Sequence, residues 1–311
     1  MSQSIDIHSN NVSIPKKEKY FKLTLSGQVL IKFIKALRIL NNFKSTVKLR
    51  LNEKSLAFNE VDPTKSCYLE FELLKENFDE FEINNEMEIP LEINNKKNAN
   101  LNFLKILKLP KNKKTDLIIE YNSEDSISIK YENGTYILSH DDYDYIDKKV
   151  DEKTLDLSHK AYLNSSSLKN ELNELKSYNF EAVLFRLNKK DSEMAIFSNK
   201  NACTKEKKDS VTKTISLEDQ SIVSSDISSK LYNLNFLTRF IPIKDGYFQN
   251  NEILELCFGN YTPLLIKNEK SGIKFKYILA PSTLNDDEED DELEEDFDDL
   301  DDDLDELEDL D

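Results

Sequence analysis

Two segments, LNFLKILKLP at residues 101–110 and LNFLTRFIPI at residues 234–243, begin with the same four residues and lie 133 positions apart. Each reads as a short helix that ends near a proline, Pro110 or Pro242. A longer helix candidate precedes each one: VLIKFIKALRIL from Val29 and SLKNELNELKSY from Ser167, offset by 138 positions. The matching order, offset and proline stop indicate an internal duplication.

Short runs of alternating apolar and polar residues occupy both halves. The first half contains STVKLRL, CYLEFEL, LIIEY and SISIKYE, and the second contains EAVLFRL, EMAIF, ILELCF and KFKYIL. Alternation with a period of two is typical of half-buried antiparallel strands. Each half therefore reads helix, strands, helix, strands, which predicts an α+β protein with two similar domains.

The negative charge is concentrated in the last 26 residues. Asp286–Asp311 contains 20 acids and no base, whereas residues 1–285 contain 40 acids and 42 Lys or Arg. Such a block is usually a solvated tail, and the near-neutral body can still carry a basic face. The alternative is a helix that folds when it docks on a basic, apolar groove, because the apolar residues of the tail have heptad-like spacing: Leu293, Phe297, Leu300, Leu304 and Leu307, followed by Leu310.

Several functional classes lack support in the sequence. The three cysteines have no paired spacing, which favours a reducing compartment and argues against a zinc site: Cys67, Cys203 and Cys257. No phosphate-binding glycine loop occurs, and the N-terminus does not resemble a signal peptide. The histidines form no catalytic arrangement, and SHDDYDYID at 139–147 lacks calcium-loop spacing: His8, His140 and His159. We expect a soluble intracellular protein that is not an enzyme and has no cofactor or metal.

Basic residues recur on the polar faces of the helix candidates. Lys32, Lys35 and Arg38 are spaced by three, and Lys105 and Lys108 repeat that spacing. The third helix carries Lys169 and Lys176, and we assign Lys230 and Arg239 to the fourth. Any amphipathic helix can carry lysine on its wet face, but repetition in several helices favours a surface that contacts nucleic-acid phosphates.

Together these segments resemble the sliding clamps of the proliferating cell nuclear antigen (PCNA) family. The resemblance covers about residues 20–287 and rests on six segments: FKLTLSGQVLIKFIKAL, NEVDPTKSCYLEFEL, LNFLKILKL, LNFLTRF, TPLLIK and GIKFKYILAP. It implies the DNA-clamp fold, in which three chains form a ring with helices lining the hole and antiparallel sheets outside. Double-stranded DNA would pass through without being read by sequence. The implied location is with the DNA, in the nucleus or, in other cells, the cytoplasm or nucleoid.

The resemblance also implies two sites. Five residues match basic ring-lining positions of the family: Lys32, Arg38, Lys105, Lys108 and Arg239. Lys35 adds a sixth base to this set. The third helix departs from the family, because Asn173, flanked by Glu171 and Glu174, stands where arginine is common. The second site is an apolar pocket at which polymerase, nuclease, ligase and clamp loader would dock a peptide: Val61, Tyr68, Pro263, Ile278, Ala280 and Pro281. A linker covers that pocket in the family, with Ile146 or Val150 as its inward residue here.

We divide the chain into an extension (1–18), a first clamp domain (19–140), a linker (141–156), a second clamp domain (157–285) and the acidic tail (286–311). TYILSHDD at 135–142 is expected to form an edge strand of the first domain, and KNACTKEKK at 200–208 an edge of the second. Unpaired edges of complementary charge predict head-to-tail pairing that closes a ring through a weak interface. The resemblance implies that this ring holds three chains, identical or different. Two alternatives stay open: a heteromeric or checkpoint-type clamp subunit, and an acidic-tailed chaperone that binds basic proteins.

Overall fold

The computed structural model describes thirteen segments of the chain: 19–44, 46–94, 102–110, 114–123, 126–139, 150–155, 157–188, 193–199, 210–223, 225–239, 247–248, 251–259 and 262–282. The two segments predicted from the repeated LNFL sequence both contain helices, and the expected alternating runs all form strands. No helix in these segments is long and apolar enough to cross a membrane.

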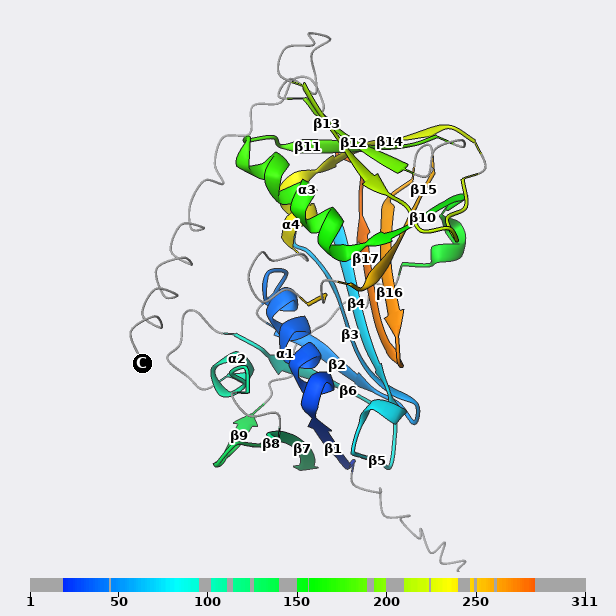
Figure 1. The fold of residues 1–311 in the computed structure, drawn as a ribbon. Coiled ribbons are helices and arrows are strands. Elements are labelled where there is room, and N and C mark those ends of the chain that lie inside the picture. Colours follow the sequence, from blue (N-terminus) through cyan, green and yellow to red (C-terminus); the bar gives the residue numbers. More distant parts are fainter. Residues whose placement is uncertain are drawn as a thin grey trace, which may run out of the picture.

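The two halves follow a similar order of elements (Figure 1). The first half consists of β1 (Phe21–Ser26), α1 (Gly27–Asn41), β2 (Thr46–Leu51), β3 (Ser55–Val61), β4 (Cys67–Leu74), η1 (Lys75–Asn77), β5 (Glu80–Ile83), β6 (Met87–Glu92), α2 (Phe103–Ile106), β7 (Asp116–Ser123), β8 (Ser126–Tyr131) and β9 (Gly134–Ser139). The second half, preceded by the 3-10 turn η2 (Glu152–Thr154), consists of β10 (His159–Asn164), α3 (Ser165–Ser177), β11 (Ala182–Leu187), β12 (Glu193–Asn199), β13 (Ser210–Ser216), β14 (Ile227–Asn233), α4 (Leu234–Arg239), β15 (Ile253–Phe258), β16 (Leu264–Lys270) and β17 (Ile273–Leu279). Each half opens with a strand followed directly by its longest helix.

The strands form three antiparallel sheets. The first half builds a sheet in the order β5-β1-β7-β8-β9, and the second half builds one in the order β13-β12-β11-β14. The largest sheet combines both halves in the order β10-β15-β16-β17-β4-β3-β2-β6. Its central pairing joins β17 to β4, from Ile273 opposite Leu73 to Leu279 opposite Cys67. The last described strand, β17, therefore fastens the second half to the first.

The helices differ greatly in length. Helix α1 begins at Gly27, whose φ of +56° lies in the left-handed region that glycine tolerates best, so the chain turns sharply from β1 into the helix. Helix α2 is a single turn, and the Asn102 side chain caps it by accepting a hydrogen bond from the Lys105 amide at 3.0 Å. The helix predicted to end near Pro110 therefore ends four residues earlier, at Ile106, and is only one turn long.

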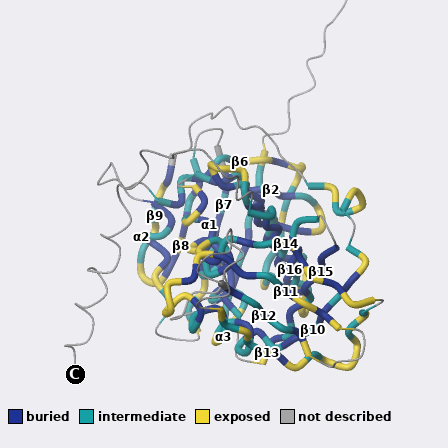
Figure 2. Tube along the Cα trace, turned by 90° about the horizontal axis from the view of Figure 1, so that it is seen from above, coloured by how far each residue is buried: buried dark blue, intermediate teal, exposed yellow. Residues whose placement is uncertain are grey.

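The main core lies between the helices and one face of the eight-stranded sheet. Apolar residues of α1 and α3, including Phe33, Leu37 and Leu172, share one buried cluster with Phe58 and Phe71 of the sheet. Buried positions gather in the interior, and exposed positions lie at the turns and periphery (Figure 2). Burying one such side chain stabilises a fold by about 1.5–3 kcal/mol, so this layer holds the helices firmly on one side. The opposite face of the sheet is left for other contacts.

Candidate nucleic-acid interface and partner pocket

A phosphate-binding surface needs basic side chains that are exposed to solvent, and some of the bases in and near α1 and α2 meet this requirement. Arg38, Lys105 and Lys108 are exposed, and Lys35 is half-buried. Helices α1 and α2 contact each other, so these side chains belong to one region of the surface. The asparagine cap of α2 holds Lys105 on a turn whose apolar residues, Phe103 and Ile106, face the core. Lys108, predicted on the same helix, lies two residues beyond its end.

Lys32 does not share this exposed surface. Its side chain is 10% exposed, and its Nζ lies 2.5 Å from Oε1 of Glu252, which is itself buried just before β15. The same ammonium lies 5.3 Å from the centroid of the Tyr247 ring. The prediction that Lys32 faces DNA is therefore not supported by its position, because the side chain instead joins α1 to the second half of the chain.

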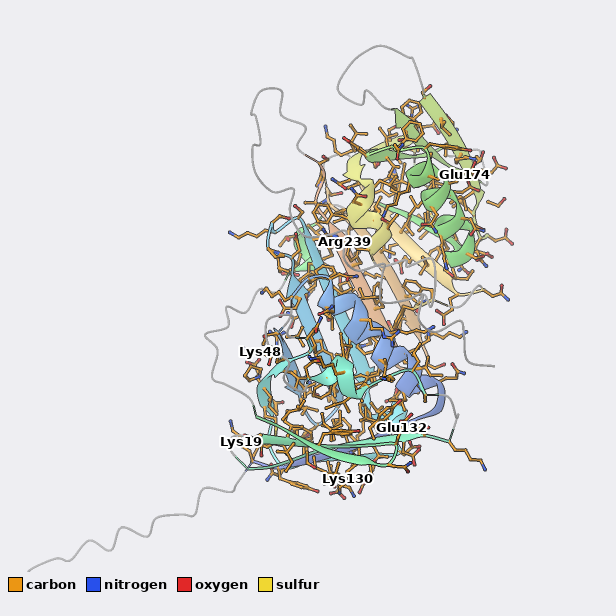
Figure 3. All side chains as sticks on the ribbon, turned by 90° about the vertical axis from the view of Figure 1, so that its left-hand side faces the viewer. Lys19, Lys48, Lys130, Glu132, Glu174 and Arg239 are labelled. Carbon is orange, nitrogen blue, oxygen red and sulfur yellow. The ribbon has the colours of Figure 1, made fainter. Side chains whose placement is uncertain are left out.

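The second half presents a mixed surface (Figure 3). Seen from the helical side, Arg239 at the end of α4 and Glu174 on α3 face the viewer. The Arg239 guanidinium lies 4.5 Å from the centroid of the Phe236 ring, which orients it along its own helix. Lys176 is exposed and Lys169 half-buried on α3.

The acids of α3 have a partner that sequence reasoning missed. Lys213 of β13 forms ion pairs with both Glu174 and Glu171. The hydrogen bond between Lys213 and Glu174 lowers the pKa of Glu174 and raises the pKa of Lys213. The acids are thus partly neutralised from a neighbouring strand, so α3 is less repulsive to phosphate than its sequence indicates.

Lys230 requires a correction. The sequence assigned it to the fourth helix, but α4 begins at Leu234 and Lys230 is an exposed residue of β14. A strand residue follows the direction of the sheet pleat rather than a helix face. Lys230 therefore does not extend the row of helical bases.

The predicted partner pocket corresponds to an apolar row on the other face of the eight-stranded sheet. Strand register places five residues directly side by side across β15, β16, β17, β4 and β3: Cys257, Leu265, Ile278, Tyr68 and Val61. Cys257, Leu265, Ile278 and Tyr68 form a second buried cluster, separate from the main core, with Val61 packed against it. We call these five residues the apolar row. Cys257 and Leu265 were missed, because only the register reveals that they join the predicted residues.

The described part of the linker packs on this row. Val150, one of the two residues predicted to point inward, packs against the second cluster, as do Leu155 of the linker and Leu157 just after it, which the sequence did not single out. Ile146 and the linker residues before Val150 lie outside the described segments. Burial under this cover raises the pKa of the Cys257 thiol to about 12 and raises the pKa of the Tyr68 hydroxyl well above its usual value.

The end of β17 completes the pocket region. The Ala280 amide donates to the Ser66 carbonyl at 2.8 Å, and the Ser282 amide donates to the Leu231 carbonyl at 2.8 Å. These bonds fix the Ala280-Pro281 segment beside the loop that leads into β4. Ala280, Pro281 and Pro263 are half-buried and border the apolar row at the ends of β17 and β16.

Comparison with solved structures identifies this arrangement. The archaeal PCNA of A. fulgidus, solved with the C-terminal region of FEN-1 bound, superposes with a TM-score of 0.67 and 18% identity, over 86% of this chain and 100% of that one. PCNA of Thermococcus kodakaraensis gives a TM-score of 0.69 and 16% identity, over 84% of this chain and 100% of that one. The chain has the PCNA-like sliding-clamp fold. A PCNA2-PCNA3 complex of Sulfolobus tokodaii gives a TM-score of 0.67 and 14% identity, over 84% of this chain and 98% of that one. The chain matches no protein-family model and no curated protein sequence.

Two edge strands bear on the predicted assembly of this PCNA-like clamp fold. Strand β9, which overlaps the predicted edge segment 135–142, ends the first-half sheet, and its Ile137 side chain is 71% exposed. In the second-half sheet the outermost described strand is β13. The segment 200–208, which was expected to form that edge, lies outside the described residues.

Proposed function

We propose that this protein is a sliding clamp that encircles duplex DNA and tethers replication and repair enzymes to it. The observation that carries the proposal is the clamp fold with its two dissimilar faces, since exposed bases accompany the helices and an apolar row lies across the opposite face of the large sheet. A scaffold of this kind needs no catalytic group.

The basic surface suits a protein that must move along DNA. Lysine and arginine contacts to phosphate are independent of sequence, whereas contacts to base edges would hold the protein at one site. We assign this role to four exposed bases and, as weaker contributors, to the half-buried Lys35, Lys169 and Arg239. The four exposed bases are Arg38, Lys105, Lys108 and Lys176. Lys32 is left out because it is engaged with Glu252.

Ring closure would use the two open edges. Addition of β13 of one copy to β9 of the next would satisfy unpaired backbone groups and cover Ile137. Because the two edges differ, the contact is head-to-tail and closes into a ring when the rotation permits it. Three copies would place the helices around a central hole. The exposed residues of β13 are polar and uncharged, which favours a weak contact or a ring built from different chains, as in the PCNA2-PCNA3 complex. The opposite charges of segments 135–142 and 200–208 would make that contact sensitive to salt.

Partner enzymes would dock at the apolar row and its border of Pro263, Ala280 and Pro281. The bound C-terminal region of FEN-1 in the A. fulgidus structure supports a peptide from a nuclease as one class of partner. We extend the proposal to DNA polymerase, ligase and clamp loader, since a processivity factor must serve each of them through one shared site.

The basic surface is tested by DNA binding at several salt concentrations. Replacing Arg38, Lys105 and Lys108 with Ala should weaken binding and reduce the slope of log K against log salt by about 3, at roughly 0.9 per lost phosphate contact. The matched control replaces Lys130, which lies on the outer sheet and pairs with Glu120, and should leave the slope unchanged. An unchanged slope in the triple variant would reject the assignment.

A further inference from the structure

Two parallel rows of side chains cross the outer face of the eight-stranded sheet. The apolar row is one, and two residues further along each strand the register aligns a charged row: Glu255, Lys267, Lys276 and Glu70. Since side chains two apart on a strand share a face, both rows point away from the main core. The linker crosses above both.

Glu152 of the linker is bound to the charged row. Its Oε1 lies 2.7 Å from Nζ of Lys276, and its Oε2 pairs with Nζ of Lys267. Lys276 also pairs with Glu70 at 3.0 Å, so the arrangement alternates in sign across the three strands β16, β17 and β4 and the linker. These bonds lower the pKa of Glu152 although partial burial opposes them. A cavity of about 440 Å³ lies beside them, and Glu152 and both lysines form part of its wall.

Residues on either side of Glu152 close the apolar row. Val150 precedes it and Leu155 follows it in the linker, Leu157 follows at the start of the second domain, and all three pack against the second cluster. Beneath them Leu265 is 0%, Cys257 1% and Ile278 5% exposed. An apolar side chain of a partner cannot reach these residues until the linker moves.

We propose that Glu152, Lys267 and Lys276 form a clasp that holds the linker closed over the apolar row and so limits access to the partner pocket. The clasp is a positioning device, and its effect on partners rests on the proposed peptide-docking function. Half-exposed ion pairs contribute little individually, so a clasp of two can shift a closed-open equilibrium several-fold without locking it. The apparent Kd of a partner then equals its Kd for the open pocket divided by the fraction of molecules that are open, so binding is weaker.

Cys257 gives a direct measure of linker opening, because it lies under the linker, whereas Cys67 lies in the main core. The rates at which iodoacetamide alkylates each thiol in the full-length protein can be followed by peptide mass analysis. Glu152→Gln should raise the Cys257 rate about threefold to tenfold and leave the Cys67 rate unchanged. The matched control is Glu72→Gln, which breaks a pair with Lys274 on the same face without touching the linker and should change neither rate.

Salt gives a second readout of the same clasp. Raising the ionic strength should accelerate Cys257 alkylation in the wild-type protein toward the rate of Glu152→Gln, while the variant changes little. Equal Cys257 rates in wild type and variant would overturn the proposal. A parallel rise at Cys67 would also overturn it, because the change would then be a general loosening of the fold.

Peptide binding separates the clasp from the proposed function. With the FEN-1 C-terminal peptide as the probe, Glu152→Gln should bind more tightly by about the factor seen in Cys257 alkylation. Weaker binding to the variant would overturn the closing role, since the linker would then be part of the docking surface. If neither protein binds the peptide while Cys257 still becomes more reactive, the clasp stands and the partner-docking function fails.

Discussion

The ion pair between Lys32 and Glu252 makes a sharp prediction about stability. Replacing Lys32 with Met keeps the length and apolar stem of the side chain but removes the ammonium. Glu252, whose side chain is 3% exposed, then loses the cation 2.5 Å away, and the Tyr247 ring loses its cation contact. Because α1 and the start of β15 belong to different halves of the chain, the damage falls on the connection between them.

The expected size of the effect follows from burial. Breaking a buried ion pair by removing one partner costs about 3–5 kcal/mol, because the remaining charge is left without compensation. We expect Lys32→Met to lower the free energy of unfolding by about 3 kcal/mol. Arg38→Ala, on the exposed side of the same helix, should change it by less than about 0.5 kcal/mol. Combining Lys32→Met with Glu252→Leu should recover most of the loss, since no charge then stays buried.

Urea unfolding followed by far-ultraviolet circular dichroism measures these differences, and DNA binding measured in parallel assigns the role of each base. Lys32→Met should leave the salt slope of DNA binding unchanged, whereas Arg38→Ala should reduce it by about 0.9. If Lys32→Met were as stable as the wild type and reduced the salt slope instead, the residue would belong to the DNA surface. The reasoning from its burial would then be refuted.

Three further predictions concern the linker, the tail and the ring. Because the pKa of Glu152 is lowered in the folded protein, its contribution to stability is fully present above the ordinary carboxyl pKa and is lost as pH falls through the lowered value. The difference in unfolding free energy between wild type and Glu152→Gln, measured by urea unfolding, should therefore be constant from pH 7 to about 5 and shrink below that. Deleting residues 286–311 should change the affinity for partner peptides in a binding titration. If the tail docks as a helix, replacing Leu293, Phe297, Leu300, Leu304 and Leu307 with Ser should have the same effect as the deletion. If only the deletion has an effect, the tail acts through its charge alone. Sedimentation at rising salt should show the oligomer dissociating, because the two predicted edge segments, 135–142 and 200–208, carry opposite charge, and an oligomer indifferent to salt would contradict that interface.

Periodicity predicted much of the fold, because a half-buried strand must alternate and a helix must repeat its apolar face. The run that became β8 alternates strictly between polar and apolar residues, and β4 and β17 alternate over part of their length, Leu69–Leu73 and Ile273–Tyr277. Sequence reasoning failed at ends and short elements, such as the single-turn α2, because tertiary contacts and caps decide where a marginal helix stops. It also failed to place Lys230, which lies only four residues before α4 begins.

The candidate sites were harder to predict for two physical reasons. A spacing of three residues turns about 60° around a helix at each step, so Lys32 and Arg38 lie about 120° apart and only Arg38 faces solvent. The apolar row depends on register between strands distant in sequence, such as Ile278 opposite Tyr68, which no local pattern encodes. The Glu152 clasp depends on the same register.

The central claim is that the protein encircles DNA, and topology tests it most directly. The protein is assembled with circular plasmid at low salt, unbound protein is removed, and retention is measured before and after a single restriction cut. A ring predicts that protein stays on the closed circle and leaves rapidly once the DNA has ends over which it can slide. Equal retention on circular and cut DNA would contradict encirclement and leave only ordinary surface binding.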